Sequence, residues 1–290
     1  MKISFIGLGA MGYPMAGHLS REHEVAVWNR TAGVAERHAK EYGTRHALAL
    51  EECADADVIL TILPTGREVD EVVEVLIERL GNGTLWIDCT SGDPVTSRST
   101  ASRLAARGVR FVDAPVTGGT PGAAKGTLTV MAGGSEQDFR ETEAIVKPFA
   151  AKVVHVGEIG SGHAIKAINN VMLGTHLWIA GECLVLARKF GIDPATALEV
   201  VNAGSGRSFV SESLLPSRVV EGKWPLVFKL ALHDKDIRIA ASMAHEQHLS
   251  TPMLALTSQI FTAALHDNPG ADYIEVLKYA AALSGEKFEE

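Results

Sequence analysis

Short apolar, β-type runs alternate with amphipathic stretches through the first half of the chain. The run 57–63 is almost continuously apolar, as expected for a strand covered on both sheet faces. Helical stretches separate most of these runs, which predicts a mostly parallel, doubly wound α/β sheet with helices on both faces. The predicted strands are 2–6, 24–28, 57–63 and 84–88, with others near 110–112, 128–131 and 153–156.

The second half is helical in pattern. Residues 162–190 fit one long helix that is apolar on much of its circumference and is therefore expected to be largely buried. The apolar positions behind this expectation are Ile165, Ile168, Val171, Met172, Leu173 and Leu177. Further helices are predicted at 194–201, 229–245, 252–265 and 274–283, and no strand is expected after residue 160. We therefore predict an α/β domain over 1–161 and an all-helical domain over 162–290.

Composition and charge narrow the class of protein. The chain has 290 residues, 46% of them hydrophobic, and a net charge of −8, which argues against binding to nucleic acid or to an anionic membrane. No secretory signal pattern is present, and the apolar stretch 173–187 is too short to span a bilayer. We expect a cytoplasmic protein without a membrane segment. The three cysteines are far apart, no metal-ligand spacing is evident, and no metal site is expected.

A glycine-rich motif directly follows the first predicted strand and opens a predicted helix. This context is the one that a dinucleotide-binding, Rossmann-type loop requires. The first glycine permits the tight turn, the second lets backbone N–H groups approach a pyrophosphate, and the third lets the helix pack against the strand. The predicted cofactor-binding residues of the motif are Gly7, Leu8, Gly9, Ala10, Met11 and Gly12.

The end of the second strand predicts the choice of cofactor. An NAD site usually carries Asp or Glu here, whereas this chain has the neutral Asn29 followed by Arg30 and Thr31. The Arg30 guanidinium suits a 2′-phosphate, so these three residues predict NADP as cofactor, with NAD as a lower-affinity alternative. The alternative for Arg30 is a solvated surface arginine.

Two further segments follow apolar strands, at the sheet edge where ligands bind in open α/β sheets. Leu63, Pro64 and Thr65 are predicted to contact the cofactor. Thr90 and Ser91 follow the next strand; either is a candidate contact, and either could equally be a turn or a helix cap.

Two motifs suggest substrate chemistry. In the segment 113–119, a hydroxyl side chain followed by two glycines can present backbone N–H donors to a carboxylate, although the same pattern also suits a simple turn. Lys166 lies in an apolar run at the start of the long helix, with Asn170 one turn later on the same face. Burial would lower the pKa of Lys166 and suit it to proton transfer. The alternative is a lysine whose charged end reaches water.

Taken in order, these elements resemble the β-hydroxyacid dehydrogenase family, whose members include 3-hydroxyisobutyrate dehydrogenase. The resemblance covers essentially the whole chain and rests on five segments: 5–12, 113–119, 126–131, 162–170 and the pair Lys235-Asp236. It implies a Rossmann-type domain joined by a long helix to an all-helical domain, with the active site in the cleft between them. It also implies a homodimer or homotetramer formed through the helical domain.

The resemblance further implies roles for the helical residues. Lys166 corresponds to the catalytic acid/base, and Asn170 to a residue that holds the substrate. Lys235 is implied to lie beside both cofactor and substrate, with Asp236 at the cofactor. Relatives that reduce imines generally lack the lysine, so Lys166 argues for an alcohol/carbonyl substrate.

The resemblance also implies a loop that binds the substrate carboxylate. This carboxylate loop corresponds to Thr117, Gly118 and Gly119 in this chain. The family usually has Ser where this chain has Thr117, and the added methyl group is expected to shift substrate choice. The segment after the fourth predicted strand, 84–88, also differs from the residues that the family usually has there. We favour Ser91 over Thr90 as the cofactor contact in this segment.

The expected function is therefore NADP-dependent hydride transfer between a small β-hydroxy acid and its semialdehyde, with a small carboxylate as substrate. The alternatives are an NADPH-dependent reductase of tartronate semialdehyde, succinic semialdehyde or glyoxylate. Outside enzymes, the alternative is an NADP-binding scaffold protein.

Overall fold

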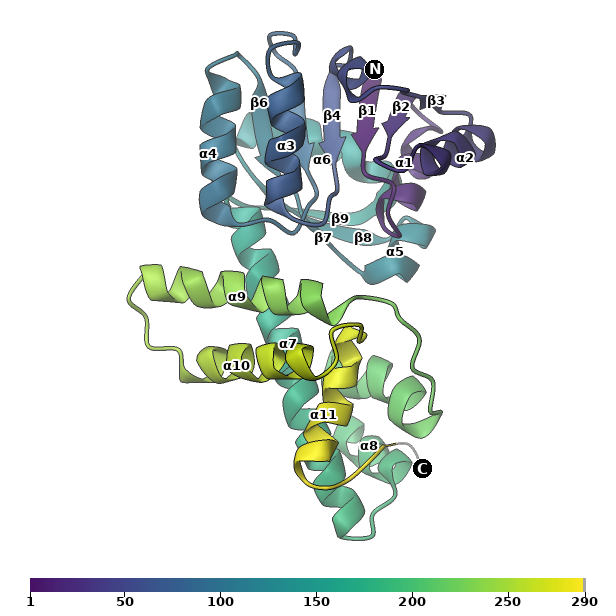
Figure 1. The fold of residues 1–290 in the computed structure, drawn as a ribbon, viewed down its shortest axis with the longest axis vertical. Coiled ribbons are helices and arrows are strands. Elements are labelled where there is room, and N and C mark those ends of the chain that lie inside the picture. The colour runs from purple at the N-terminus through teal and green to yellow at the C-terminus, as the bar shows by residue number, and fades with distance from the viewer. Residues whose placement is uncertain (289–290) are drawn as a thin grey trace. The chain divides into compact units, whose positions relative to one another are not determined.

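The computed structural model describes residues 1–288 (Figure 1). The chain forms two compact units, Met1–Lys166 and Ala167–Glu290. The predicted boundary after residue 161 lies just upstream of this division. The long helix α7 (Ser161–Lys189) starts in the first unit and continues into the second.

The first unit is built on one nine-stranded sheet with the order β3-β2-β1-β4-β5-β6-β8-β7, in which β9 also pairs with β8. Neighbours from β3 to β6 run parallel, while β8 is antiparallel to β6 and β7. The mostly parallel, doubly wound sheet is confirmed. The strands are β1 (Lys2–Ile6), β2 (Glu24–Trp28), β3 (Arg45–His46), β4 (Val58–Thr61), β5 (Leu85–Asp88), β6 (Arg110–Asp113), β7 (Val116–Thr117), β8 (Leu128–Gly133) and β9 (Ala150–Gly157).

Helices cover both faces of this sheet (Figure 1). Neighbouring strand residues such as Phe5 and Ile6 point to opposite faces and belong to two different buried apolar clusters. The chain buries both faces because its central strands are apolar at almost every position. The helices of this unit are α1 (Gly12–Leu19), α2 (Ala32–Tyr42), α3 (Gly66–Leu76), α4 (Pro94–Ala105), α5 (Gly119–Lys125) and α6 (Glu136–Val146).

The second unit is helical, and within the described residues no strand follows β9. Its core contains Leu177 of α7 together with Ile237, Phe261 and Leu277 from later helices. Gly191 follows the long helix with a φ of +74°, a backbone conformation that glycine adopts without strain and that is common where a helix ends. The remaining helices are α8 (Pro194–Ala203), α9 (Leu230–Glu246), α10 (Pro252–Asp267) and α11 (Val276–Leu283), with shorter helical segments at Val210–Leu214, Pro216–Val220 and Tyr273–Glu275.

The expected burial of α7 was wrong for part of its surface. Val171 and Leu177 are buried, but Ile165, Ile168 and Met172 are exposed. The reason is that a single long helix can press only one stripe of its circumference into the core of its unit. By length and composition alone α7 could cross a membrane, a property that core helices share.

Candidate functional site

The glycine-rich loop between β1 and α1 has the backbone geometry of a phosphate-binding turn. Gly7 has a φ of +104°, and a Cβ atom there would collide with the carbonyl oxygen of Ile62. A Cβ on Gly12 would collide with the carbonyl oxygen of Gly7, so α1 packs directly on the turn. Space around Gly9 is open, and the residue is exposed. The loop therefore leaves room for a phosphate group at the start of α1.

Asn29, at the end of β2, holds this loop in place. Its Oδ1 accepts a hydrogen bond from the Leu8 N–H at 3.0 Å, and its Nδ2 donates to the Thr31 carbonyl at 3.1 Å. Arg30 and Thr31 are exposed beside it. Asn29 thus has a positioning task that its sequence position did not reveal, while the Arg30 side chain extends from the same turn.

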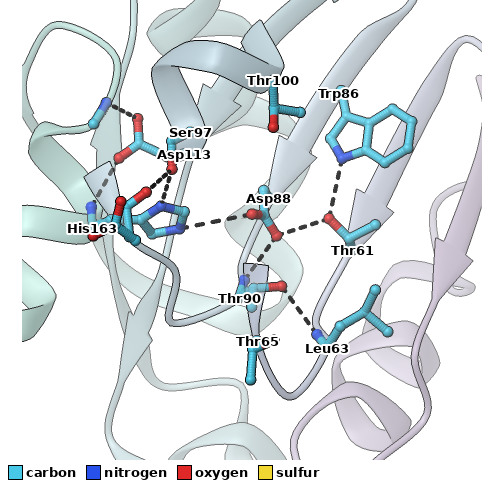
Figure 2. A network of polar contacts seen from close by, with 12 residues as sticks. Thr61, Leu63, Thr65, Trp86, Asp88, Thr90, Ser97, Thr100, Asp113 and His163 are labelled. Atoms are coloured by element: carbon cyan, nitrogen blue, oxygen red, sulfur yellow. Dashed lines mark hydrogen bonds and ion pairs between the residues drawn. The ribbon is translucent and has the colours of Figure 1, made fainter. Parts of the chain in front are cut away.

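The loops that follow β4 and β5 are joined through a buried carboxylate (Figure 2). Asp88 Oδ1 accepts from the Thr61 hydroxyl at 2.8 Å and from the Thr90 N–H at 3.0 Å. The Thr90 hydroxyl in turn accepts the Leu63 N–H at 3.0 Å. Thr90 is fully buried, whereas Ser91 is half-buried. Thr90 thus ties the two loops together, and Ser91 stays the predicted cofactor contact.

The predicted carboxylate loop lies at the junction of β7 and α5. Thr117 pairs with Thr129 of β8, and the next two residues are exposed glycines in left-handed conformations. Gly118 has a φ of +125° and Gly119 a φ of +62°, which other residues adopt only with strain. This chain path turns the backbone sharply and leaves the Thr117 side chain half-buried at the turn.

Asp113, the last residue of β6, caps the start of α7. Its Oδ1 accepts the Gly160 N–H at 2.7 Å and its Oδ2 accepts the His163 N–H at 2.8 Å. Burial raises the pKa of this carboxyl, and the nearby His163 opposes that shift. Lys166 follows one turn later and is half-buried rather than buried. The strand that leads into the carboxylate loop therefore also fixes the helix that carries Lys166.

The remaining predicted residues form a polar network in the second unit. Asn170 Nδ2 donates to Asp236 Oδ2 at 2.6 Å, and Lys235 Nζ lies 3.0 Å from Asp236 Oδ1. His233 Nε2 donates to the Asn170 carbonyl at 2.8 Å. Asp236 thus orients both the Asn170 amide and the Lys235 ammonium group.

The predicted cofactor residues of the first unit follow the carboxyl ends of β1, β2, β4 and β5, so these parallel strands gather them at one edge of the sheet. A hollow of about 710 Å³, lined by Lys2, Asp55 and Arg79 among others, opens instead at the amino ends of the strands. Burial raises the pKa of the Cys53 thiol to about 12 and raises that of Cys89, so neither is suited to act as a nucleophile. Within residues 1–288, no group of three His, Cys, Asp or Glu side chains converges on a metal-sized site.

Sequence reasoning assigned no task to Asp88, Ser97, Asp113 and His163. Asp113 and His163 lie inside two of the five segments that carry the resemblance, and this was the signal in the sequence that could have identified them. Their partners are 27 to 66 residues away, and only the folded chain brings them together.

Two family models together match most of the chain. Residues 2–157 match the NAD binding domain of 6-phosphogluconate dehydrogenase. Residues 160–280 match a domain described as NAD-binding of NADP-dependent 3-hydroxyisobutyrate dehydrogenase.

Similar proteins extend over nearly the full length. The chain is 35% identical to 2-(hydroxymethyl)glutarate dehydrogenase of Eubacterium barkeri over 268 residues, covering 90% of this chain and 88% of the relative. It is 32% identical to 3-hydroxyisobutyrate dehydrogenase of Pseudomonas aeruginosa, with coverage of 93% and 94%. The solved structure of Mycobacterium tuberculosis 3-hydroxyisobutyrate dehydrogenase with L-serine matches with a TM-score of 0.87 at 28% identity, covering 95% of this chain and 97% of that one.

Proposed function

This chain is an oxidoreductase of the β-hydroxyacid dehydrogenase family, and from that premise we propose that it interconverts a small β-hydroxy acid and its semialdehyde with NADP(H). The observation that carries the proposal is the double role of β6. Its last residue, Asp113, caps the helix of Lys166, and the chain then runs directly into the loop of Thr117, Gly118 and Gly119. One strand end thus sets both the proposed proton donor and the proposed carboxylate loop.

The first unit fits a dinucleotide. The glycine turn leaves no room for a Cβ at Gly7 or Gly12 but leaves open space at Gly9, as a bound pyrophosphate requires. The exposed Arg30 supports the preference for a 2′-phosphate, with NAD as the weaker alternative. When bound, the nicotinamide supplies or accepts the hydride at the substrate carbon.

The residues of this chain supply the remaining chemistry. The backbone N–H groups and hydroxyl of the Thr117–Gly119 loop hold the substrate carboxylate. Lys166 donates a proton from Nζ to the carbonyl oxygen as that oxygen becomes an alkoxide, and takes a proton back in the oxidation direction. Asn170, one turn later on α7, orients the same oxygen. The amide of Asn170 is pre-oriented for this task by its hydrogen bond to Asp236.

The substrate class is a small carboxylic acid that carries a β-hydroxyl or aldehyde group. The M. tuberculosis relative is described with L-serine, itself a β-hydroxy acid, which supports this class. Tartronate semialdehyde, succinic semialdehyde and glyoxylate are the alternative carbonyl substrates. A scaffold protein that catalyses no reaction would not require Lys166 or the carboxylate loop. We therefore favour an enzyme over a scaffold protein.

We also propose that the protein is a cytoplasmic homodimer or homotetramer. Helix α7 exposes Met172, Ile179 and Leu186, and Phe190 follows it, 78% exposed. Apolar side chains of this size on one helix favour coverage by a second copy of the chain. Sedimentation velocity measures the resulting mass directly.

The test of the proposed function follows the absorbance of NADPH, and separately of NADH, with four carbonyl acids. These are methylmalonate semialdehyde, tartronate semialdehyde, succinic semialdehyde and glyoxylate. NADPH oxidation with one of them supports the proposal and identifies the substrate. Turnover with NADH alone refutes the cofactor preference, and tight NADPH binding without turnover of any of the four favours the scaffold.

A further inference from the structure

The side chain of His18 joins the two helices that follow the glycine turn and the carboxylate loop. His18 lies in the last turn of α1, and its imidazole is buried. Its Nε2 lies 3.0 Å from the carbonyl oxygen of Ala123 and 3.1 Å from that of Ala124, near the end of α5. A backbone carbonyl accepts hydrogen bonds and cannot donate them. Nε2 therefore carries a proton and donates it to these oxygens, whatever the charge of the ring.

Helix α5 holds one side of the carboxylate loop. It has only seven residues and continues the loop directly, because the Gly118 carbonyl accepts the Gly122 N–H at 3.1 Å. On the other side, Thr117 pairs with β8. Gly118 and Gly119 have no side chains with which to fix the path between these two supports, and glycine is the most flexible residue. The position of the loop therefore depends on the position of α5.

The C-terminal end of α5 packs closely around the imidazole. Gly126 ends the helix with a φ of +68°, and a Cβ atom there would lie 3.4 Å from His18 Cε1 and 3.0 Å from the Pro148 carbonyl oxygen. The last carbonyls of a helix have no partners within the helix itself. The Gly126 N–H supplies one to Ala123, at 3.3 Å, and His18 supplies a second donor that Ala124 shares.

Helix α1 is itself held firmly by the sheet. The side chains of Met15, Ala16 and Leu19 are fully buried. At the other end of the helix, Gly12 packs directly on the Gly7 carbonyl of the glycine turn. The sheet and the glycine turn therefore set the position of α1, and the imidazole of its last turn extends this constraint to α5.

We propose that His18 is a positioning residue, which fixes the carboxylate loop relative to the glycine turn by holding the C-terminal end of α5 against α1. This inference rests on the proposed role of the loop in binding the substrate carboxylate. Without the Nε2 donor, the end of α5 is released and the two glycines let the loop shift. The substrate carboxylate should then bind more weakly, whereas the glycine turn keeps its own contacts and its affinity for the cofactor.

Three variants separate the hydrogen bond from the volume of the ring. His18→Leu fills much of the same space without a donor. His18→Gln places an amide N–H as many bonds from Cα as Nε2 and should restore the contact. His155→Leu is the matched control, because His155 of β9 also donates from Nε2 to a backbone carbonyl, that of Gly134, at 2.8 Å. Neither residue of this control pair belongs to α1 or α5.

The first experiment requires no substrate. Amide hydrogen exchange is followed by mass spectrometry in the peptide 119–127, where the N–H groups of Gly122, Gly126 and Thr127 bond to backbone carbonyls. In His18→Leu we expect exchange in this peptide to be roughly 10-fold faster, with the peptide 2–12 unchanged, because only the end of α5 is released. His18→Gln should restore most of the protection, and His155→Leu should match the wild type. Unchanged protection of 119–127, or equal acceleration in both peptides, overturns the proposal.

The second experiment measures the effect on the substrate. We expect His18→Leu to raise KM for the carbonyl acid by roughly 10-fold, with kcat and the NADPH Kd changed by less than about threefold, because a shifted loop weakens binding in the ground state and the transition state alike. His18→Gln should recover most of the loss, and His155→Leu should keep the wild-type KM. A merely structural role would lower the thermal midpoint of His18→Leu and leave KM unchanged, which would contradict the proposal.

The two experiments distinguish this inference from the proposed function. Absence of turnover in the wild type would refute the proposed function alone, because the exchange measurement needs no substrate. Faster exchange in 119–127 together with an unchanged KM would overturn the positioning role. If His18→Leu does not fold, His18→Ala removes the same donor and takes its place in both experiments.

Discussion

Asp113 Oδ2 accepts the backbone N–H of His163 at 2.8 Å, so a strand side chain caps a helix that begins 48 residues later in the chain. Helix starts are usually capped by a residue next to them in sequence. Here the cap comes from the strand that enters the carboxylate loop. The position of the helix is therefore tied to the sheet rather than to the preceding loop.

The first prediction concerns this cap. Asp113→Asn replaces one carboxylate oxygen by an NH₂ group, which must face the N–H of either Gly160 or His163. We expect the free energy of unfolding to fall by roughly 1–3 kcal/mol, the cost of a buried donor without an acceptor. Urea unfolding checks this value, and Asp138→Asn, on α6 in the same unit, shows the effect of removing a less buried carboxylate. Equal losses in the two variants would contradict the capping role.

The second prediction concerns cofactor choice. Arg30→Ala should weaken NADP(H) binding by roughly 10- to 100-fold and leave NAD(H) binding almost unchanged, because a charged hydrogen bond to the 2′-phosphate is lost. Fluorescence titration with both cofactors measures this. Lys40→Ala removes another exposed cation, from α2, and should change neither affinity. Equal losses for both cofactors in Arg30→Ala would refute the assignment.

The third prediction concerns the proton donor. Lys166→Ala should keep NADP(H) affinity and lower kcat by roughly 100- to 10,000-fold, the usual contribution of a general acid or base. Steady-state kinetics and cofactor titration on the same preparation separate the two effects. Lys152→Ala, an exposed lysine on β9, serves as the matched control. Near-normal turnover without Lys166 would exclude the mechanism.

The fourth prediction concerns the loop hydroxyl. Thr117→Ser removes one methyl group and keeps the hydroxyl, which should favour bulkier substrates. We expect the ratio of kcat/KM for a branched over an unbranched semialdehyde to rise by about tenfold, within the 1–3 kcal/mol that such a group contributes. Thr127→Ser, an exposed position nearby, should leave the ratio unchanged. A ratio that stays constant in Thr117→Ser would place the methyl group outside the pocket.

The fifth prediction concerns stability below neutral pH. Burial lowers the pKa of His38 below its ordinary 6.5, so the unfolded chain binds a proton more readily than the folded chain. The contribution of His38 is fully present above pH 6.5 and is lost as pH falls through the lowered native pKa. Urea unfolding between pH 5 and 8 should show a smaller pH dependence in His38→Gln than in the wild type. The same slope in both proteins would contradict the prediction.

Local patterns in the sequence were sufficient for most of the fold. The apolar run 57–63 predicted a doubly covered strand, and the alternation around it predicted a parallel sheet, because side-chain periodicity reflects which faces exclude water. The strands β3 and β7 were not predicted, because two residues are too few to show the alternation of apolar and polar side chains that marks a strand. Burial of α7 was predicted too broadly, since composition does not reveal which stripe of a helix meets its core.

The sequence by itself determined the glycine turn, the Arg30 position and the lysine helix, because each depends on residues within one short segment. Only the tertiary structure decided how these parts are held. Asn29 clasps the glycine loop, Asp88 joins two loops, and Asp113 caps α7, each through a partner that is at least 21 residues away. The role of a buried carboxylate or imidazole depends on the hydrogen-bond donors and charges around it. These groups come together only when the folded sheet brings the ends of distant strands to one edge.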